Sequence, residues 1–169
     1  MNNDGVPIPI IVAALTGAVS LVVLAVNAWV HGRRERNHRL RDIYSKAFSA
    51  AVAYEEFPFV VRRRRASNPE DERIRISTEL RKVQEDISYY SAWLTTESSH
   101  VSEAYDSLIA EMRAFAGAAI REAWETQPMS DDSGMAMPDF GLAVLKPLKE
   151  RYLSEVATHL ASTPRWLRR

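Results

Sequence analysis

The most concentrated charge in this chain of 169 residues is a run of four arginines, which follows an apolar stretch containing Pro58 and precedes the acidic residues 70–72. The chain has no net charge, whereas domains that bind nucleic acid usually carry a basic excess. The balance of charge and the nearby acids therefore argue against nucleic acid. Cations at a helix end complement the helix dipole, but one or two suffice for that role. Two interpretations remain: the four arginines complete a helix end, or they form a patch that contacts a protein partner. The four residues are Arg62, Arg63, Arg64 and Arg65.

Other residues with useful chemistry do not form a recognisable site. The histidines have no spacing that would place metal ligands on one helix face. Glu55 and Glu56 are adjacent, so on a helix they point in different directions and do not form the carboxylate pair of an acid–base catalyst. The chain has no cysteine, no phosphate-binding loop and no hydrolase motif. We therefore expect no catalytic residue, no metal, no cofactor and no small-molecule substrate. The four histidines are His31, His38, His100 and His159.

The strongest signal is an uncharged N-terminal run. Residues 5–30 carry no charged side chain, and residues 8–30 are almost wholly apolar. About 20 helical residues cross a hydrocarbon core of about 30 Å, and a helix satisfies its own backbone in lipid. A cleaved signal peptide is the competing interpretation, but the first residues lack Lys and Arg and include Asp4. We predict an extracytoplasmic tail over residues 1–7 and a transmembrane helix over residues 8–30.

Basic residues after this run predict its orientation. By the positive-inside rule, a cluster of arginines keeps the following chain in the cytoplasm. Trp29 would then lie at the cytoplasmic boundary of the bilayer. The C-terminal tail, residues 164–169, also mixes basic and aromatic residues, and it is either a lipid-contacting segment or a solvated end. The residues expected at the lipid interface are Trp29, Arg33, Arg34, Arg36, Arg39, Arg41, Trp166, Arg168 and Arg169.

Small residues within the predicted span suggest self-association. Ala13 with Gly17, and Ala14 with Ala18, are pairs four residues apart that permit close contact between helices. Asn27 could add a hydrogen bond between two spans.

Apolar periodicity after residue 31 predicts four helices. The first runs from about residue 33 to 63, and Pro58 should kink it or end it early. The second is signalled by Ser67 or Asn68 as the cap and by Pro69 in the first turn. The third begins near Ser98. The fourth covers residues 138–161, or starts near residue 146 if Pro147 delays it.

Two of these segments carry heptad seams of the coiled-coil kind. The second segment has Ile76, Leu80, Val83, Ile87, Tyr90 and Leu94. The third has Val101, Tyr105, Leu108, Met112, Phe115 and Ala119.

These elements predict an all-α protein: a single N-terminal transmembrane helix continuing into a cytoplasmic antiparallel, up-down four-helix bundle over residues 31–163. In this topology the four arginines lie at the pole far from the membrane, with Asp131 and Asp132 of the 126–138 loop as possible partners. A straight helix of that length also takes the four arginines beyond the reach of the lipid surface potential, unless Pro58 folds the chain back to the membrane surface.

The abundance of Arg over Lys, and of Ala, is typical of a GC-rich bacterial coding sequence. We therefore expect a single-pass protein of the bacterial inner membrane whose bundle is a non-catalytic interaction or scaffold module. Its partners would be the lipid bilayer, an unidentified protein and a second copy of itself. The alternative is a small membrane effector or sensor, as in a bacterial or prophage defence module, whose spans assemble to perturb the membrane.

Overall fold

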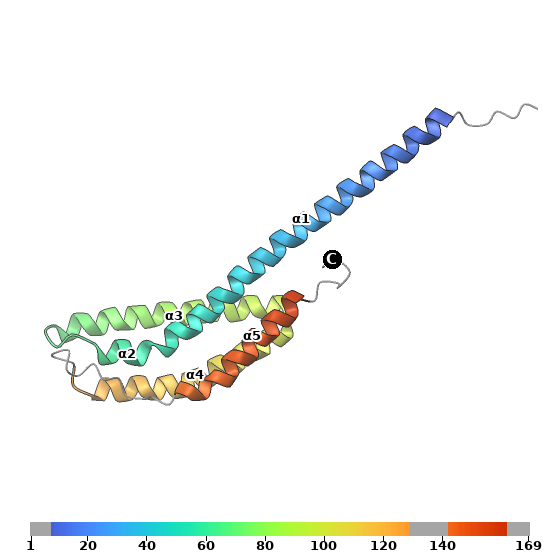
Figure 1. Cartoon of the computed structure of the whole chain (residues 1–169). Helices are drawn as coiled ribbons and strands as arrows, with labels where there is room; N and C mark the ends of the chain where they lie inside the picture. Colours follow the sequence, from blue (N-terminus) through green and yellow to red (C-terminus); the bar gives the residue numbers. More distant parts are fainter. Residues whose placement is uncertain (1–7, 129–141, 162–169) are drawn as a thin grey trace, which may run out of the picture. The chain divides into compact units, whose positions relative to one another are not determined.

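The computed structural model describes residues 8–128 and 142–161, and for residues 8–20, 22 and 142 it describes the backbone alone. The prediction of an all-helical chain is confirmed, since the described residues form helices and contain no strand (Figure 1). In chain order the elements are α1 (Ile8–Glu55), α2 (Phe57–Arg62), α3 (Pro69–Glu97), α4 (Ser99–Glu125), the 3₁₀ helix η2 (Leu142–Leu145) and α5 (Lys146–Ala161).

The chain divides into two compact units, Met1–Leu40 and Arg41–Arg169. The first contains α1 up to Leu40. The second contains the rest of α1 and all later helices, which form a helical bundle as predicted.

The helices begin and end where the backbone chemistry of the sequence indicates. The long first segment breaks before Pro58, which lies in the first turn of α2, because proline lacks the backbone donor that a helix interior needs. Asn68 caps α3, and its side chain accepts a hydrogen bond from the Asp71 backbone N–H. Ser98 caps α4 in the same way, accepting from Val101 N–H. The last helix takes the later of its two expected starts, Lys146.

Helix α4 is the centre of the bundle, and α2, α3, α5 and η2 all pack against it. Its buried stripe departs from the predicted seam at Phe115, which is 38% exposed, while Ala116 is fully buried. The prediction for Phe115 was therefore wrong. The reason is geometric: a straight helix has 3.6 residues per turn, so a strict seven-residue repeat drifts off the buried face. The observed stripe consists of Val101, Tyr105, Leu108, Met112, Ala116, Ala119 and Ala123.

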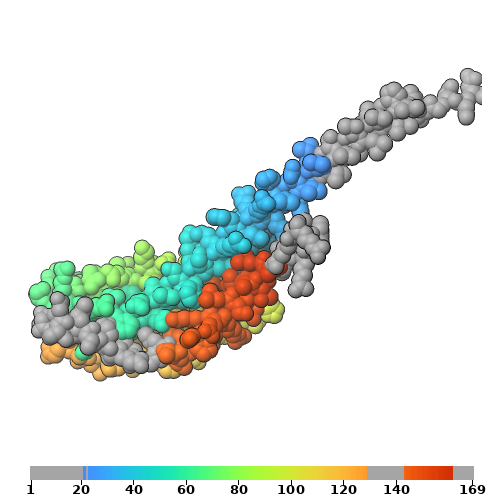
Figure 2. Space-filling view, viewed as in Figure 1, coloured from blue at the N-terminus to red at the C-terminus, as the bar shows by residue number. Residues whose placement is uncertain are grey.

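Two buried tyrosines fasten α4 and α5 to the C-terminal part of α1. The Tyr105 hydroxyl donates to the Ala47 carbonyl at 3.1 Å, and the Tyr152 hydroxyl donates to the Tyr44 carbonyl at 2.9 Å. The two tyrosine rings lie 5.5 Å apart, and Tyr152 also stacks on Phe48. Figure 2 shows atoms of α5 lying directly against those of α1 in this unit. Each ring thus fills the core while its hydroxyl finds a partner.

Polar contacts show the direction in which neighbouring helices run. Ser91 pairs with Asp106 and Thr95 with Ser102, so α3 and α4 run antiparallel. Lys149 forms an ion pair of 2.5 Å with Glu55 at the end of α1. At the opposite end of α5, His159 lies 3.9 Å from Glu97 of α3. The C-terminal end of α5 and the α3–α4 turn therefore lie at the same end of the bundle.

Within the part of the chain that the structure describes, no helix has a stretch both long and apolar enough to cross a membrane.

Candidate functional site

The arginine turn, which we define as residues 62–65, joins α2 to α3 and is the site that the sequence singled out. The third residue of the turn, Arg64, is buried with 8% of its surface exposed. One terminal nitrogen of Arg64 donates to the carbonyls of Val61 at 3.0 Å and Ala123 at 2.8 Å. The other donates to the carbonyls of Trp124 at 3.2 Å and Thr126 at 2.5 Å.

Three of these four acceptors lie at the C-terminal end of α4 or directly after it. The last carbonyls of a helix have no partner within the helix, and they form the negative end of its dipole. Arg64 supplies both donors and positive charge there, and its guanidinium also lies over the Trp124 ring, 4.9 Å from the ring centre. The turn after α2 is therefore fastened to the end of α4 by one side chain.

Desolvation by burial lowers the pKa of Arg64, and the neighbouring charge of Arg62 lowers it further. An arginine pKa begins so high that the group remains charged at physiological pH. The buried cation is therefore permanent, and its four carbonyl acceptors compensate for lost hydration.

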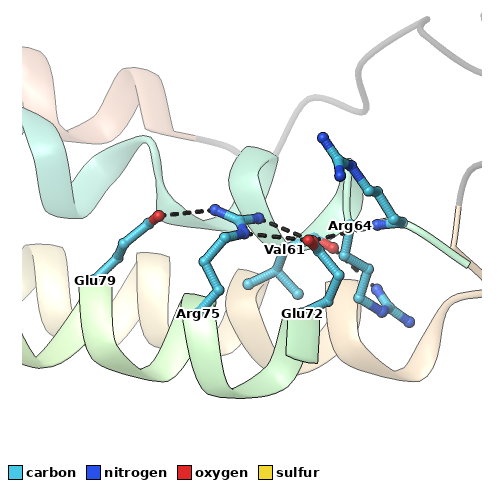
Figure 3. Close-up of polar contacts among 6 residues, drawn as sticks. Val61, Arg64, Glu72, Arg75 and Glu79 are labelled. Atoms are coloured by element: carbon cyan, nitrogen blue, oxygen red, sulfur yellow. Dashed lines mark hydrogen bonds and ion pairs between the residues drawn. The ribbon is translucent and has the colours of Figure 1, made fainter. Parts of the chain in front are cut away.

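A carboxylate next to the turn ties it to the start of α3. Glu72 is buried and accepts two hydrogen bonds from Arg75, at 2.9 and 3.2 Å, and one of 3.4 Å from the Arg65 backbone N–H. Arg75 also reaches Glu79 at 2.8 Å, and Figure 3 shows it lying between the two carboxylates. The hydrogen bonds that Arg75 donates hold the pKa of the Glu72 carboxyl below its ordinary value. Because Glu72 and Glu79 accept these bonds, they raise the pKa of Arg75.

The four arginines therefore have different environments. Arg64 is buried, Arg62 is half-buried, and Arg63 and Arg65 are exposed. Burial keeps Arg64 from contacting a partner protein in this structure, whereas Arg63 and Arg65 are accessible. The exposed acids Glu70 and Asp71 lie a few residues away at the start of α3. A patch made by all four side chains remains a prediction, and Arg64 would contribute to it only by holding the turn in place.

The predicted proximity of the turn to the segment after α4 is confirmed, because Arg64 binds the Thr126 carbonyl. The expected acidic partners, Asp131 and Asp132, lie outside the described residues. What the sequence did not reveal is which of four consecutive arginines faces inward. Helical spacing offered one signal, since Arg64 follows the buried Phe57 and Val61 at intervals of four and three.

The predicted lipid-interface residues in the first unit lie on α1. Trp29, Arg34 and Arg39 are exposed, and the Arg33 guanidinium lies 5.5 Å from the centre of the Trp29 ring. Asn27, which was predicted to pack within the span, is also exposed. Arg36 is exposed in the first unit and Arg41 is exposed in the second. For Ala13, Ala14, Gly17 and Ala18 the structure describes the helical backbone alone, and Trp166, Arg168 and Arg169 lie outside the described residues.

A polar cluster between α3 and α4 was not anticipated. The Asp106 carboxylate accepts from Ser91 at 2.7 Å and from Ser102 at 3.4 Å, and Thr95 lies 3.0 Å from the Ser102 hydroxyl. Ser91, Thr95 and Asp106 line a groove together with the apolar residues Ile87 and Ile109. Among the described residues the hydroxyl groups of Ser91 and Ser102 therefore bond to one carboxylate, and the Ser102 hydroxyl also bonds to Thr95, which links α3 to α4.

The histidines do not assemble with carboxylates into a metal site within the described ranges, 8–128 and 142–161. His159 contacts the edge of the Tyr44 ring in the second unit, where it also approaches Glu97.

Comparisons of the chain with known protein families, with curated proteins and with solved structures gave no match.

Proposed function

We propose that the chain is a single-pass protein of the bacterial inner membrane, with its N-terminus outside and its C-terminus in the cytoplasm. In this proposal the span covers residues 8–30 and continues into an up-down four-helix bundle. The bundle is a non-catalytic interaction module that holds a protein partner, or a second copy of the chain, at the membrane.

The observation that carries the membrane part is the order of residues along the chain. An uncharged run over residues 5–30 is followed by five arginines and then by an amphipathic bundle. The boundary between the two compact units, after Leu40, falls within this arginine cluster. That position supports a plan in which one unit anchors the other.

The division of charged residues into those that bind within the bundle and those that remain exposed supports an interaction role. Arg64, Glu72 and Lys149 bind within the fold, where they hold helix ends together. Arg63 and Arg65 remain exposed at the arginine turn. A rigid turn that presents two cations is suited to an acidic protein surface.

Cysteine labelling tests the orientation, because the natural chain contains no cysteine. We expect Asn3→Cys to react with a membrane-impermeant maleimide in intact cells, and Arg65→Cys to react only after lysis. Recovery of the protein in the membrane fraction after alkaline extraction tests the anchor itself. The reverse labelling pattern would overturn the orientation, and release into the soluble fraction would overturn the membrane assignment.

Affinity capture from native membranes tests the interaction role. The Arg63→Glu/Arg65→Glu variant should lose a partner that the wild type retains, and Arg73→Glu, an exposed cation on α3, serves as the matched control. A loss of membrane potential on overexpression that depends on Gly17 and Asn27 would instead support the effector alternative.

A further inference from the structure

The groove between α3 and α4 combines apolar side chains with an acid. Its volume is about 500 Å³, which lies within the range of about 300–1,000 Å³ found for pockets that bury a ligand. The acid among its lining residues, Asp106, is exposed. Such a groove suits a segment that carries both an apolar and a cationic side chain. The apolar lining residues are Ile87, Ala92, Ile109 and Ala110.

The groove lies within an acidic part of the chain. Residues 83–112, which form the second half of α3, the turn and the first half of α4, contain six acidic side chains and neither Lys nor Arg. Within residues 8–128 and 142–161, the three of these acids that lie on α4 have no ion-pair partner. The described fold therefore leaves three carboxylates of this hairpin without a cation. The six acids are Glu85, Asp86, Glu97, Glu103, Asp106 and Glu111.

The residues that follow α5 carry the opposite charge. We define the C-terminal segment as residues 162–169, which include Arg165, Arg168 and Arg169, no acid, and the apolar side chains of Trp166 and Leu167. An arginine can bind a carboxylate through two parallel hydrogen bonds, and a tryptophan combines a large apolar area with one donor. The C-terminal segment therefore has side chains that match both kinds of group in the groove.

The helix that precedes this segment ends beside the hairpin that carries the groove. His159, in the last turn of α5, lies 3.9 Å from Glu97, the last residue of α3. The groove begins at Thr95, two residues before Glu97, and extends along α3 to Ile87, which is about 12 Å of helix. The eight residues after Ala161 cover up to about 26–29 Å when extended. The C-terminal segment is therefore long enough to pass the end of α3 and to lie along the groove.

We propose that the C-terminal segment binds in the groove between α3 and α4 of the same chain, with Trp166 against the apolar lining residues and an arginine paired with Asp106. Each Asp106 oxygen accepts one described hydrogen bond, which leaves lone pairs for an arginine. Because α5 tethers the segment, its effective concentration at the groove is about millimolar, so a few contacts suffice to hold it. The bound segment covers the groove and keeps other basic segments from it. This contact lies within the bundle and does not depend on the proposed membrane anchor.

Disulfide formation in the full-length chain, purified in a neutral detergent, tests the contact, because the natural chain has no cysteine. Arg169→Cys supplies one thiol and keeps Trp166 and two of the three arginines. Ser88→Cys supplies the second thiol in the groove, and Ser45→Cys, which is exposed on α1 near the C-terminal end of α5, is the matched control. Under the same mild oxidation, we expect the Ser88→Cys/Arg169→Cys chain to form an intramolecular disulfide at least about tenfold faster than the Ser45→Cys/Arg169→Cys chain.

Further changes in the Ser88→Cys/Arg169→Cys chain separate specific binding from random contact. Trp166→Ala keeps every charge and alters no described residue of the bundle, and it should lower the rate to within about twofold of the control. Asp106→Arg should do the same, because it replaces the acceptor with a like charge. Glu111→Arg makes the same change of charge on α4 outside the groove, and it should lower the rate less than about threefold. Trp166→Ala remains decisive if Asp106→Arg unfolds the bundle.

Equal rates for the two cysteine pairs would overturn the inference, because a segment that stays in water or binds the detergent micelle meets both positions alike. A fast rate that survives Trp166→Ala would overturn it too, because charge alone would then hold the segment near the hairpin. An effect of Glu111→Arg as large as that of Asp106→Arg would likewise exclude the groove as the binding site. Membrane extraction and capture of a partner by the arginine turn are measured separately and do not depend on these outcomes.

Discussion

Replacement of Arg64 is the sharpest test of how the bundle is held together. In Arg64→Ala, the buried Ala123 carbonyl loses its hydrogen bond from Arg64, and the part-buried bonds to Trp124 and Thr126 are lost too. A hydrogen bond to a charged group contributes about 1.5–3 kcal/mol when buried, and less where water can replace the donor. The cation at the negative end of α4 and its contact with Trp124 add about 0.5–1 kcal/mol each.

We therefore expect Arg64→Ala to lower the free energy of unfolding by about 3–4 kcal/mol. For a chain of this size the midpoint of thermal unfolding should fall by about 6–16 °C. Arg63→Ala, the exposed neighbour, is the matched control and should cost less than about 0.5 kcal/mol. Arg64→Lys should lie between the two, because an ammonium retains the charge but not the planar fork that reaches several carbonyls.

Urea unfolding of the full-length chain, followed by far-UV circular dichroism, measures these differences. The slope of free energy against urea should be equal for all variants, so that a shift in midpoint reports stability and not a change in the unfolded chain. A cost for Arg64→Ala below about 1 kcal/mol, or no larger than that of Arg63→Ala, would refute the role of Arg64 as the fastener of α4.

Three further predictions concern the core and its edge. Tyr105→Phe and Tyr152→Phe each remove a hydroxyl donor and leave the ring, so each should cost about 0.5–1.5 kcal/mol in the same unfolding assay. Burial raises the pKa of both tyrosines above their ordinary value of about 10. The protonated hydroxyls of the two tyrosines therefore contribute fully to stability below about pH 10, and this contribution is lost as the pH rises above it. The urea midpoint should fall above about pH 10 in the wild type, and it should fall less in the Tyr105→Phe/Tyr152→Phe variant. A double-mutant cycle on Glu55 and Lys149 should give a coupling of about 1 kcal/mol, and a coupling near zero would show that water screens this pair.

Much of the fold was predictable because it depends on local chemistry. Pro58 removes a backbone donor wherever the chain goes, so it ends α1 near its position. The side chains of Asn68 and Ser98 accept hydrogen bonds from the first N–H groups of a helix, which have no partner within that helix. Helices α3 and α4 therefore begin directly after these two residues, α3 at Pro69. The prediction at Phe115 was wrong because each seven-residue step shifts a position by about 20° around a straight helix, which moved position 115 off the buried face while Ala119 stayed on it.

The candidate site was predictable only in outline. The sequence indicated a helix end at the arginines with more charge than one helix needs, and the turn does lie beside the segment after α4. It could not show that Arg64 serves the end of a different helix, because that contact joins residues about 60 positions apart. The cluster around Asp106 was missed for the same reason, since its hydroxyl partners come from two helices.

By itself the sequence determined helical periodicity, helix ends and charge order, including the uncharged N-terminal run and the arginines that follow it. These are properties of neighbouring residues, and they follow from backbone geometry and side-chain chemistry alone. The tertiary structure decided which arginine is buried, which tyrosine hydroxyls meet α1 carbonyls, and which face of α4 stays open. Those outcomes depend on how helices that are distant in the sequence pack into one core, and no single segment of the sequence determines the energy of that packing.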